Sequence, residues 1–407
     1  MKTLILALGA ASAACLPALL DAFWRHRRAT DPAPKPPGGA RPGRVLALVP
    51  ARAEGARMLP LCADLRSEGE AANVSVDVCV VLDGSDVAAA ETLRAAGVDV
   101  LEKAPAGPSK GAALGFATQG LDAAGRIDAA AFVLVFDADM RLADGFFRDL
   151  AVPSGCEAFQ LPVRPAGVPP PGAARVEAFS LGAARVDDLA RDAEGLPVRL
   201  RGKAMGFSPR AWRLGPAAAH RTTAEDSEAT LALAAAGVRL RALAGPFALD
   251  EPPANASAMA ASRARWLGGH LKLLFAGAGN LLRLAVRSPR GAFTLAADLW
   301  LRPRLLVLAF ALLLALVADG ALVALSLGGG IRAEGGLAVP LAASAISKLT
   351  LVFEALSALA VRQRLGTPPE IPEVTLADLA DSLGMWLRAM GRAFQSPSAW
   401  HRARPEA

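Results

Sequence analysis

The sequence predicts an α/β domain with a mixed, mostly parallel sheet, set between apolar segments near the two ends of the chain. Short apolar runs alternate with segments of helical spacing from Arg44 onward, the pattern expected of a parallel sheet covered by helices. Acidic residues follow two of these runs, as in α/β domains that bind a ligand at the strand ends. Of the 407 residues 53% are hydrophobic, and the mean hydropathy is +0.35, so we also expect membrane segments.

The first apolar segment predicts a transmembrane anchor over residues 1–24. Residues 4–24 carry almost no charge until Asp21, and the cluster Arg25-His26-Arg27-Arg28 follows, which favours a spanning helix with a cytoplasmic C-terminal end. The alternative is a cleaved signal peptide, with a weak lipoprotein cleavage signal at Cys15. Residues 25–43 are rich in proline and glycine and predict a linker.

Strands and helices alternate through the first half of the following domain, predicted over residues 44–262. The predicted strands lie at 44–49, 74–82, 98–101 and 131–136, and the predicted helices at 55–69, 87–96 and 111–121. Beyond Asp139 the alternation weakens, with helices expected over 173–190 and 226–236 and an irregular segment near Gly202. Residues 263–304 predict an amphipathic, cationic segment that lies at the membrane interface.

A second membrane element is predicted over residues 305–361, as a hairpin of two apolar stretches separated by glycines. Arginines flank the hairpin on its outer sides, which places the domain and the tail over 362–407 in the cytoplasm. Asp319, Lys348 and Glu354 lie inside the stretches, where ionisable groups are costly, and a pairing of Lys348 with Asp319 has no further support in the sequence. The alternative for the second stretch is a buried or interfacial helix.

Several classes of protein are disfavoured by composition. The 4 cysteines and 4 histidines show no metal-ligand spacing and no disulfide framework. The net charge of +6 is explained by arginines at membrane flanks, and no basic stripe with aromatics suggests nucleic-acid binding. The turn after the first strand lacks the glycine pattern of a Rossmann dinucleotide site.

The acidic residues at the strand ends suggest a metal and phosphate site. Asp137 and Asp139 follow the strand at 131–136, and two nearby carboxylates suit Mg²⁺ or Mn²⁺, which in turn can hold a diphosphate. Asp83 follows another strand and could contact a base or ribose. An Asp-x-Asp pair alone is most often a solvated turn, so its meaning depends on the surrounding motifs.

A series of short motifs along the chain accompanies the Asp137–Asp139 pair. In chain order they are Pro50–Glu54, Asp83–Asp86, Lys110–Leu114, Asp137–Asp139, Gly202–Phe207, Ala224–Glu228 and Ser262–Trp266. From about Arg44 to Gly269 this order resembles the family 2 glycosyltransferases, inverting enzymes with a GT-A nucleotide-sugar-binding fold. The membrane segments before and after resemble those of membrane-anchored synthases or of ceramide glucosyltransferase-like members.

The resemblance implies a role for each matched residue. Asp226 would be the catalytic base, and Asp137 and Asp139 would hold Mg²⁺ or Mn²⁺. Nucleotide-sugar binding would involve Glu54, Asp83, Lys110 and Asp137. Contacts to the acceptor or the diphosphate would involve Gly202, Glu225, Arg265 and Trp266. Three residues depart from the family pattern and bear on acceptor binding, Ser262, Ala204 and Ala224.

The chemistry agrees with these roles. Inverting transfer needs a base for the acceptor hydroxyl and charge stabilisation for the leaving nucleoside diphosphate. Simpler interpretations remain open: Trp266 as a membrane-interface anchor, Asp226 as a helix N-cap, Lys110 as a solvated loop residue and Glu54 as a surface carboxylate.

We therefore expect a multi-pass inner (plasma) membrane hexosyl- or N-acetylhexosaminyltransferase with a cytoplasmic catalytic domain. Its expected donor is a nucleotide sugar, a UDP-sugar by resemblance, and its acceptor a lipid or glycan. Three spans are few for a secretion pore, which favours transfer of single sugars or polymerisation with partner subunits for export. The alternative is a non-catalytic GT-A-like scaffold or partner subunit of an envelope polysaccharide synthase.

Overall fold

The computed structural model describes residues 2–28, 39–251, 256–300, 304–327, 338–365 and 373–395. Most of the expected linker and the glycine-rich turn of the expected hairpin lie outside these residues.

A parallel sheet forms the first half of the domain, as predicted. Strands β1 (Arg44–Ala51), β2 (Ser75–Asp83), β3 (Asp99–Lys103) and β4 (Phe132–Val135) lie in the order β3-β2-β1-β4, all parallel. Helices α2 (Leu59–Ala71), α3 (Val87–Ala95), α4 (Lys110–Ala123) and α5 (Arg126–Ala129) connect them. Because the strands are parallel, Asp83 at the end of β2 and the residues after β4 meet at one edge of the sheet.

Short strands, one of them antiparallel to its neighbours, extend the sheet beyond β4. The order continues with β8 (Met205–Phe207), β6 (Ala158–Gln160) and β9 (Leu240–Ala242), where β8 runs antiparallel to both of its neighbours. A second sheet has the order β5 (Met140–Leu142), β10 (Ala248–Asp250), β7 (Val163–Pro165). Since β5 begins directly after Asp139, its pairing with β10 fixes the loop that carries both aspartates.

Helices pack on both faces of the main sheet and enclose two cores. One core lies between the sheet and α2 and α3, around Leu61, Leu65 and Phe159. The other lies under α4, α8 (Pro209–Leu214) and α9 (Glu225–Ala235), where fully buried Trp212 donates from Nε1 to Thr118 Oγ1 at 3.0 Å. The short α6 (Phe146–Asp149) and the long α7 (Ala173–Ala193) complete the domain.

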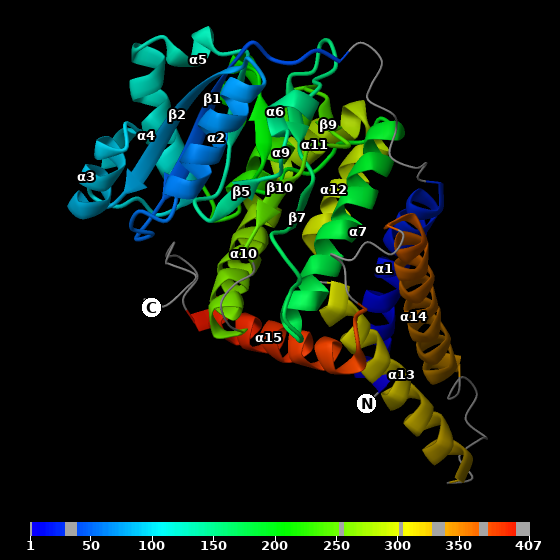
Figure 1. The fold of residues 1–407 in the computed structure, drawn as a ribbon. Helices are drawn as coiled ribbons and strands as arrows, with labels where there is room; N and C mark the ends of the chain where they lie inside the picture. Colours follow the sequence, from blue (N-terminus) through cyan, green and yellow to red (C-terminus); the bar gives the residue numbers. More distant parts are fainter. Residues whose placement is uncertain are drawn as a thin grey trace.

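The expected amphipathic segment consists of several helices that pack on the domain and on the tail. It begins earlier than predicted, with α10 (Ala256–Ala276), and Gly277 separates α10 from α11 (Ala278–Arg287). Leu284 of α11 and Leu295 of α12 (Pro289–Trp300) are buried in the second core, whereas Leu282 and Val286 are exposed. The tail helix α15 (Leu376–Gln395) crosses below α10 and α7 and contacts both (Figure 1).

Three long helices lie side by side at the other end of the molecule (Figure 1). Helix α1 (Lys2–Arg28) packs along α14 (Ala338–Leu365), and α14 packs along α13 (Arg304–Leu327). By length and composition, two segments among the described residues could cross a membrane, Leu305–Ala324 and Pro340–Arg364. Lys348 Nζ lies 3.0 Å from Asp319 Oδ2, so the two hairpin helices are joined by this ion pair. The N-terminal span stays a prediction.

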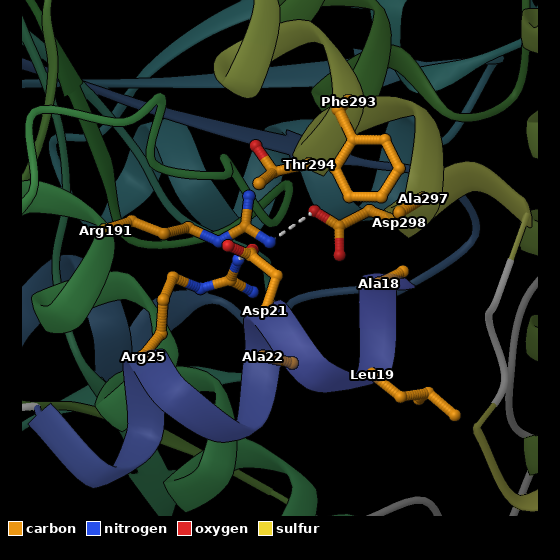
Figure 2. A pocket seen from close by; sticks show the side chains of 10 residues that line it. All are labelled: Ala18, Leu19, Asp21, Ala22, Arg25, Arg191, Phe293, Thr294, Ala297 and Asp298. Atoms are coloured by element: carbon orange, nitrogen blue, oxygen red, sulfur yellow. Dashed lines mark hydrogen bonds and ion pairs between the residues drawn. The ribbon is translucent and has the colours of Figure 1, made fainter. Parts of the chain in front are cut away.

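Buried charges join α1 to the domain. Arg25 Nη2 lies 3.1 Å from Asp187 Oδ1 on α7, and Asp187 Oδ2 lies 2.9 Å from Arg191 Nε and from Arg199 Nη2. A small cavity of about 20 Å³ lies beside this cluster, between α1 and α12. Figure 2 shows the side chains that line it, with Arg191 paired to Asp298. The C-terminal end of α1 is therefore fixed to the domain by ion pairs that are shielded from water.

Candidate active site

One end of the candidate site is built around Asp83. This carboxylate is buried, and its Oδ1 accepts a hydrogen bond from the Gly107 N–H at 2.8 Å. Arg52, in the segment after β1, forms an ion pair with Asp83 and donates to the Gly107 carbonyl. Lys103 Nζ lies 3.6 Å from Asp83 Oδ1. Arg52 lies inside a motif that the sequence analysis named, but its pairing with Asp83 depends on the parallel pairing of β1 and β2.

Lys110 links two of the predicted motifs. Its ammonium group pairs with Asp137 and donates to the Gly202 carbonyl. It is the first residue of α4, whose N-cap Ser109 accepts from the Ala112 N–H at 3.2 Å. Its side chain is only 11% exposed, so the solvated-loop interpretation is wrong. Burial alone would lower the pKa of Lys110, but Asp137 and Glu225 outweigh burial and raise it, so the group stays charged.

A second lysine was missed by the sequence analysis. Lys203 pairs with Asp250 of β10. Burial lowers the pKa of Lys203, whereas the carboxylates of Asp250, Asp137 and Asp139 raise it by more, so its charge faces the Asp137–Asp139 loop. Lys203 lies within the Gly202–Phe207 motif and could have been considered there. No sequence pattern marks Asp250, because the pairing of β10 with β5 brings it to the site.

Buried Gln160 holds the loop that carries Gly202 and Lys203. Its Nε2 donates to the carbonyls of Lys203 at 2.9 Å and Ala204 at 3.1 Å, while its Oε1 accepts from the Arg201 N–H at 2.9 Å. Gly202 has a φ of +79°, which favours glycine. A Cβ at Gly202 would lie 3.6 Å from Asp226 Oδ2, so this backbone passes directly beside the next pair of carboxylates.

Glu225 and Asp226 form the first turn of α9, with Ala224 as the N-cap. The interpretation of Asp226 as the N-cap is therefore wrong by two residues. Burial raises the pKa of Glu225 to about 7, against the lowering effect of Lys110. Burial also raises the pKa of Asp226, while hydrogen bonds from Ser227 and the charge of Lys110 lower it. Both groups bind protons more tightly than exposed carboxylates do.

Helix α10 contributes Arg265 to the candidate site. Burial lowers the pKa of Arg265, while Glu225, Asp137 and Glu54 raise it, so its guanidinium lies among the acidic groups of the site. The Arg265 carbonyl accepts from Thr223 Oγ1 at 2.9 Å, which ties α10 to the loop before α9. Glu54 also faces Arg57, with Oε2 3.7 Å from Nη1.

Trp266 is half-buried in a small apolar cluster with the tail helix. Its ring centroid lies 3.8 Å from that of His270 and 6.3 Å from that of Trp386 on α15. The predicted contact of Trp266 with the acceptor or the diphosphate and its alternative as a membrane-interface anchor both stay predictions.

The arrangement brings together most of the predicted site residues. Lys110 contacts Asp137 and Gly202, and Glu225, Asp226 and Arg265 surround this group. Among the described residues no group of three or more His, Cys, Asp or Glu side chains could hold a metal ion by itself. Asp137, with a side chain 35% exposed, and Asp139 offer two carboxylates that could hold a divalent ion together with oxygens from a ligand or water.

Comparison with known proteins establishes the fold and leaves the reaction open. No family model matches the sequence, and no curated protein is similar to it. The mannosyltransferase PcManGT from Pyrobaculum calidifontis, in complex with GDP-mannose and Mn²⁺, superimposes with a TM-score of 0.53 at 18% identity. The match covers 86% of this chain and 98% of the mannosyltransferase chain. Because residues 44–262 make up a smaller share of this chain, helices outside that range also belong to the shared fold.

Two further solved structures overlap less completely. Mannosyl-3-phosphoglycerate synthase from Rubrobacter xylanophilus has 16% identity, 62% coverage of this chain and 75% of its own, with a TM-score of 0.35. Glucosyl-3-phosphoglycerate synthase from Mycobacterium tuberculosis, in complex with Mn²⁺, UDP and phosphoglyceric acid, has 15% identity and a TM-score of 0.37. This match covers 56% of the present chain and 78% of the synthase chain. At this overlap neither structure adds to the assignment.

Proposed function

We propose that this chain is an inverting membrane glycosyltransferase that moves a sugar from a nucleotide-sugar donor to a lipid or glycan acceptor. One observation carries the proposal: Lys110, with a side chain only 11% exposed, contacts Asp137 at the strand edge and lies beside the partly buried pair Glu225 and Asp226. This brings a phosphate-binding edge and a candidate general base into one site. The fold shared with a mannosyltransferase supports it.

Donor binding is assigned to the end of the site nearest β2. Asp83 and Glu54 would contact the nucleoside, and the cations Lys110, Lys203 and Arg265 would face the diphosphate. The motif around Asp83 favours a UDP-sugar, while the mannosyltransferase of the same fold holds GDP-mannose. A donor panel must therefore include both nucleotides.

Asp137 and Asp139 are suited to hold Mg²⁺ or Mn²⁺ together with the diphosphate. Divalent ions of this kind are commonly bound by one or two carboxylates plus phosphate oxygens, and the loop between β4 and β5 offers these two. A bound ion would stabilise the negative charge that develops on the leaving nucleoside diphosphate.

Asp226 is assigned as the general base. Its carboxylate would take the proton of the acceptor hydroxyl as that oxygen attacks the anomeric carbon from the side opposite the diphosphate, which inverts the configuration. Glu225, raised to a pKa of about 7, would hold a proton part of the time near neutral pH and orient the acceptor by hydrogen bonding. Arg265 would balance the charge of the departing diphosphate.

The acceptor is assigned to the membrane side of the molecule. The candidate spans Leu305–Ala324 and Pro340–Arg364, together with the predicted N-terminal span, would place the catalytic domain on the cytoplasmic face of the inner (plasma) membrane. Three spans are few for a self-contained pore, so we favour single transfer to a lipid, or polymerisation with partner subunits, over self-contained polymer secretion. Export of a polymer would need partner subunits.

A donor screen tests the proposal. The full-length protein in lipid nanodiscs is incubated with UDP-glucose, UDP-N-acetylglucosamine, UDP-galactose or GDP-mannose, with membrane lipid extract and Mn²⁺ or Mg²⁺. We expect release of nucleoside diphosphate from one donor, lost on chelation and restored by metal. Should no donor be turned over under any of these conditions, the alternative of a non-catalytic scaffold or partner subunit would be favoured, as the departures at Ser262, Ala204 and Ala224 would allow.

A further inference from the structure

The loop that carries Gly202 and Lys203 has a backbone conformation that must be held from outside. Gly202 has a φ of +79° and Ala204 a φ of +52°. The left-handed region is unfavourable for a residue with a Cβ, so it persists at Ala204 only where the surroundings fix the backbone. The same loop brings the Gly202 carbonyl to Lys110 and the Lys203 ammonium group to Asp250. Relaxation of this backbone would therefore displace two contacts of the candidate site.

Arg201, directly before Gly202, ties this loop to helix α7. Its Nε and Nη2 donate to Asp188 Oδ2 at 3.0 and 2.6 Å, and Nη2 also donates to the Ala184 carbonyl at 3.1 Å. The Arg201 side chain is 16% exposed and the Asp188 side chain 5%, so water hardly competes for these contacts. Because Gln160 holds the same loop from β6, the loop is fixed by one strand and one helix.

Helix α7 is itself held by ion pairs on its other side. Asp187, next to Asp188, lies 3.1 Å from Arg25 of α1 and 2.9 Å from Arg199. Arg199 Nε also lies 3.9 Å from Asp188 Oδ1. Ion pairs therefore continue from the C-terminal end of α1 through α7 to Arg201, and α7 gives the loop a fixed point of attachment.

We propose that Arg201 and Asp188 are positioning residues for sugar transfer, which hold the segment 202–203 against Lys110. The inference rests on the proposed function, since it assigns positioning residues to the same site. The charge of Arg201 is matched by Asp188, so the pair serves the geometry of the loop and not the binding of a ligand. Without the pair the backbone at Ala204 relaxes, and turnover falls while the protein stays folded.

Replacement of the whole pair tests the proposal on the full-length protein in nanodiscs. The double variant Arg201→Met/Asp188→Leu removes one charge of each sign, and apolar replacement of a buried ion pair often leaves stability unchanged. With whichever of UDP-glucose, UDP-N-acetylglucosamine, UDP-galactose and GDP-mannose the wild type turns over, we expect kcat to fall by about 10- to 100-fold. The thermal unfolding midpoint should stay within about 3 °C of the wild type.

Two further variants separate positioning from a general effect on the fold. Arg201→Lys keeps the positive charge and loses the forked contact, so it should recover much of the loss and lower kcat by about 3- to 10-fold. Arg241→Met/Asp192→Leu is the matched control, because it removes an ion pair of 2.7 Å between β9 and the same helix α7 that does not touch the loop. The control should keep the wild-type kcat.

Hydrogen–deuterium exchange gives a readout that needs no activity. Peptides that span residues 201–204 should exchange faster in Arg201→Met/Asp188→Leu and in Arg201→Lys than in the wild type and the control. Wild-type exchange in both Arg201 variants would overturn the positioning role. Wild-type kcat in both, while Asp226→Asn is inactive, would also overturn it and leave the proposed function standing. A wild type inactive on every donor would overturn both. Should the double variant not fold, Arg201→Lys alone decides by the same two measurements.

Discussion

The pair Glu225 and Asp226 shows how burial changes the chemistry of single residues. Partial burial of both carboxyl groups disfavours the charged form, while Lys110 partly restores it. Because the two groups are adjacent, they titrate as a pair. A base in this setting loses its proton nearer to neutral pH than an exposed aspartate would, which suits proton abstraction at that pH.

The rate of transfer should depend on pH through this pair. Asp226 acts as a base only when ionised, and burial raises its pKa, so kcat/KM should fall as the pH decreases into the acidic range. Glu225→Gln removes a neighbouring negative charge and should move this acidic limb about 1 pH unit lower. The measurement is the initial rate from pH 5 to 9. An acidic limb that stays in place in Glu225→Gln would show that this pair does not control the rate.

Helix α4 positions Lys110 through a close backbone contact. A Cβ on Gly111 would overlap the Ala219 carbonyl oxygen, and no side-chain movement could relieve this because the obstacle is backbone. Gly120 on the same helix has nothing within 4 Å of such a Cβ. The first turn of α4 is thus pressed against the loop before α9, which holds Lys110 beside Glu225.

Alanine at these two glycines should therefore behave differently. Gly111→Ala should shift the start of α4, lower activity by about 100-fold and destabilise the protein by about 1–3 kcal/mol. Gly120→Ala should leave activity unchanged and be neutral or stabilising by up to about 1 kcal/mol. Rates and thermal unfolding midpoints in nanodiscs check both. Equal effects of the two substitutions would contradict the close contact.

The elements also show what could be predicted from the sequence. Strands β1 and β2 are long apolar runs between clear turns, and they were predicted with nearly the observed ends. Strands β5 to β10 have 3 residues each, too few for a period to be recognised. The residues they position were missed for the same reason. Lys110 and Asp226 lie in recognisable motifs, whereas Asp250 reaches the site only through the pairing of β10 with β5.

At the scale of the whole molecule, α1 is joined to the catalytic domain by buried charge. Burial alone would raise the pKa of Asp187, but Arg191, Arg25 and Arg199 outweigh it and hold the pKa well below its usual range. Removal of one charged side chain from such a cluster is strongly destabilising, because the remaining charges stay buried without compensation.

Arg25→Met should therefore lower the stability by about 3–5 kcal/mol. Arg27→Met, at an exposed position two residues further, should change it by less than about 0.5 kcal/mol. Thermal unfolding of both variants in nanodiscs measures the difference. Equal midpoints would mean that α1 is not held by this cluster.

The orientation of the molecule in the membrane can be checked directly. The arginines flanking the hairpin predict a cytoplasmic catalytic domain. Protease should cleave within residues 39–251 in inverted inner-membrane vesicles and leave them intact in spheroplasts. The opposite pattern would favour an exported lipoprotein and would contradict the predicted topology.

The site between the Asp137–Asp139 loop and the start of α9 is proposed to transfer sugar with Asp226 as the base. Asp226→Asn tests it most directly, with Asp144→Asn at an exposed position as the matched control. Release of nucleoside diphosphate in the presence of metal and lipid should fall by about 10²- to 10⁴-fold in Asp226→Asn, with donor affinity retained, and stay at the wild-type rate in Asp144→Asn. Wild-type turnover by Asp226→Asn would contradict the account.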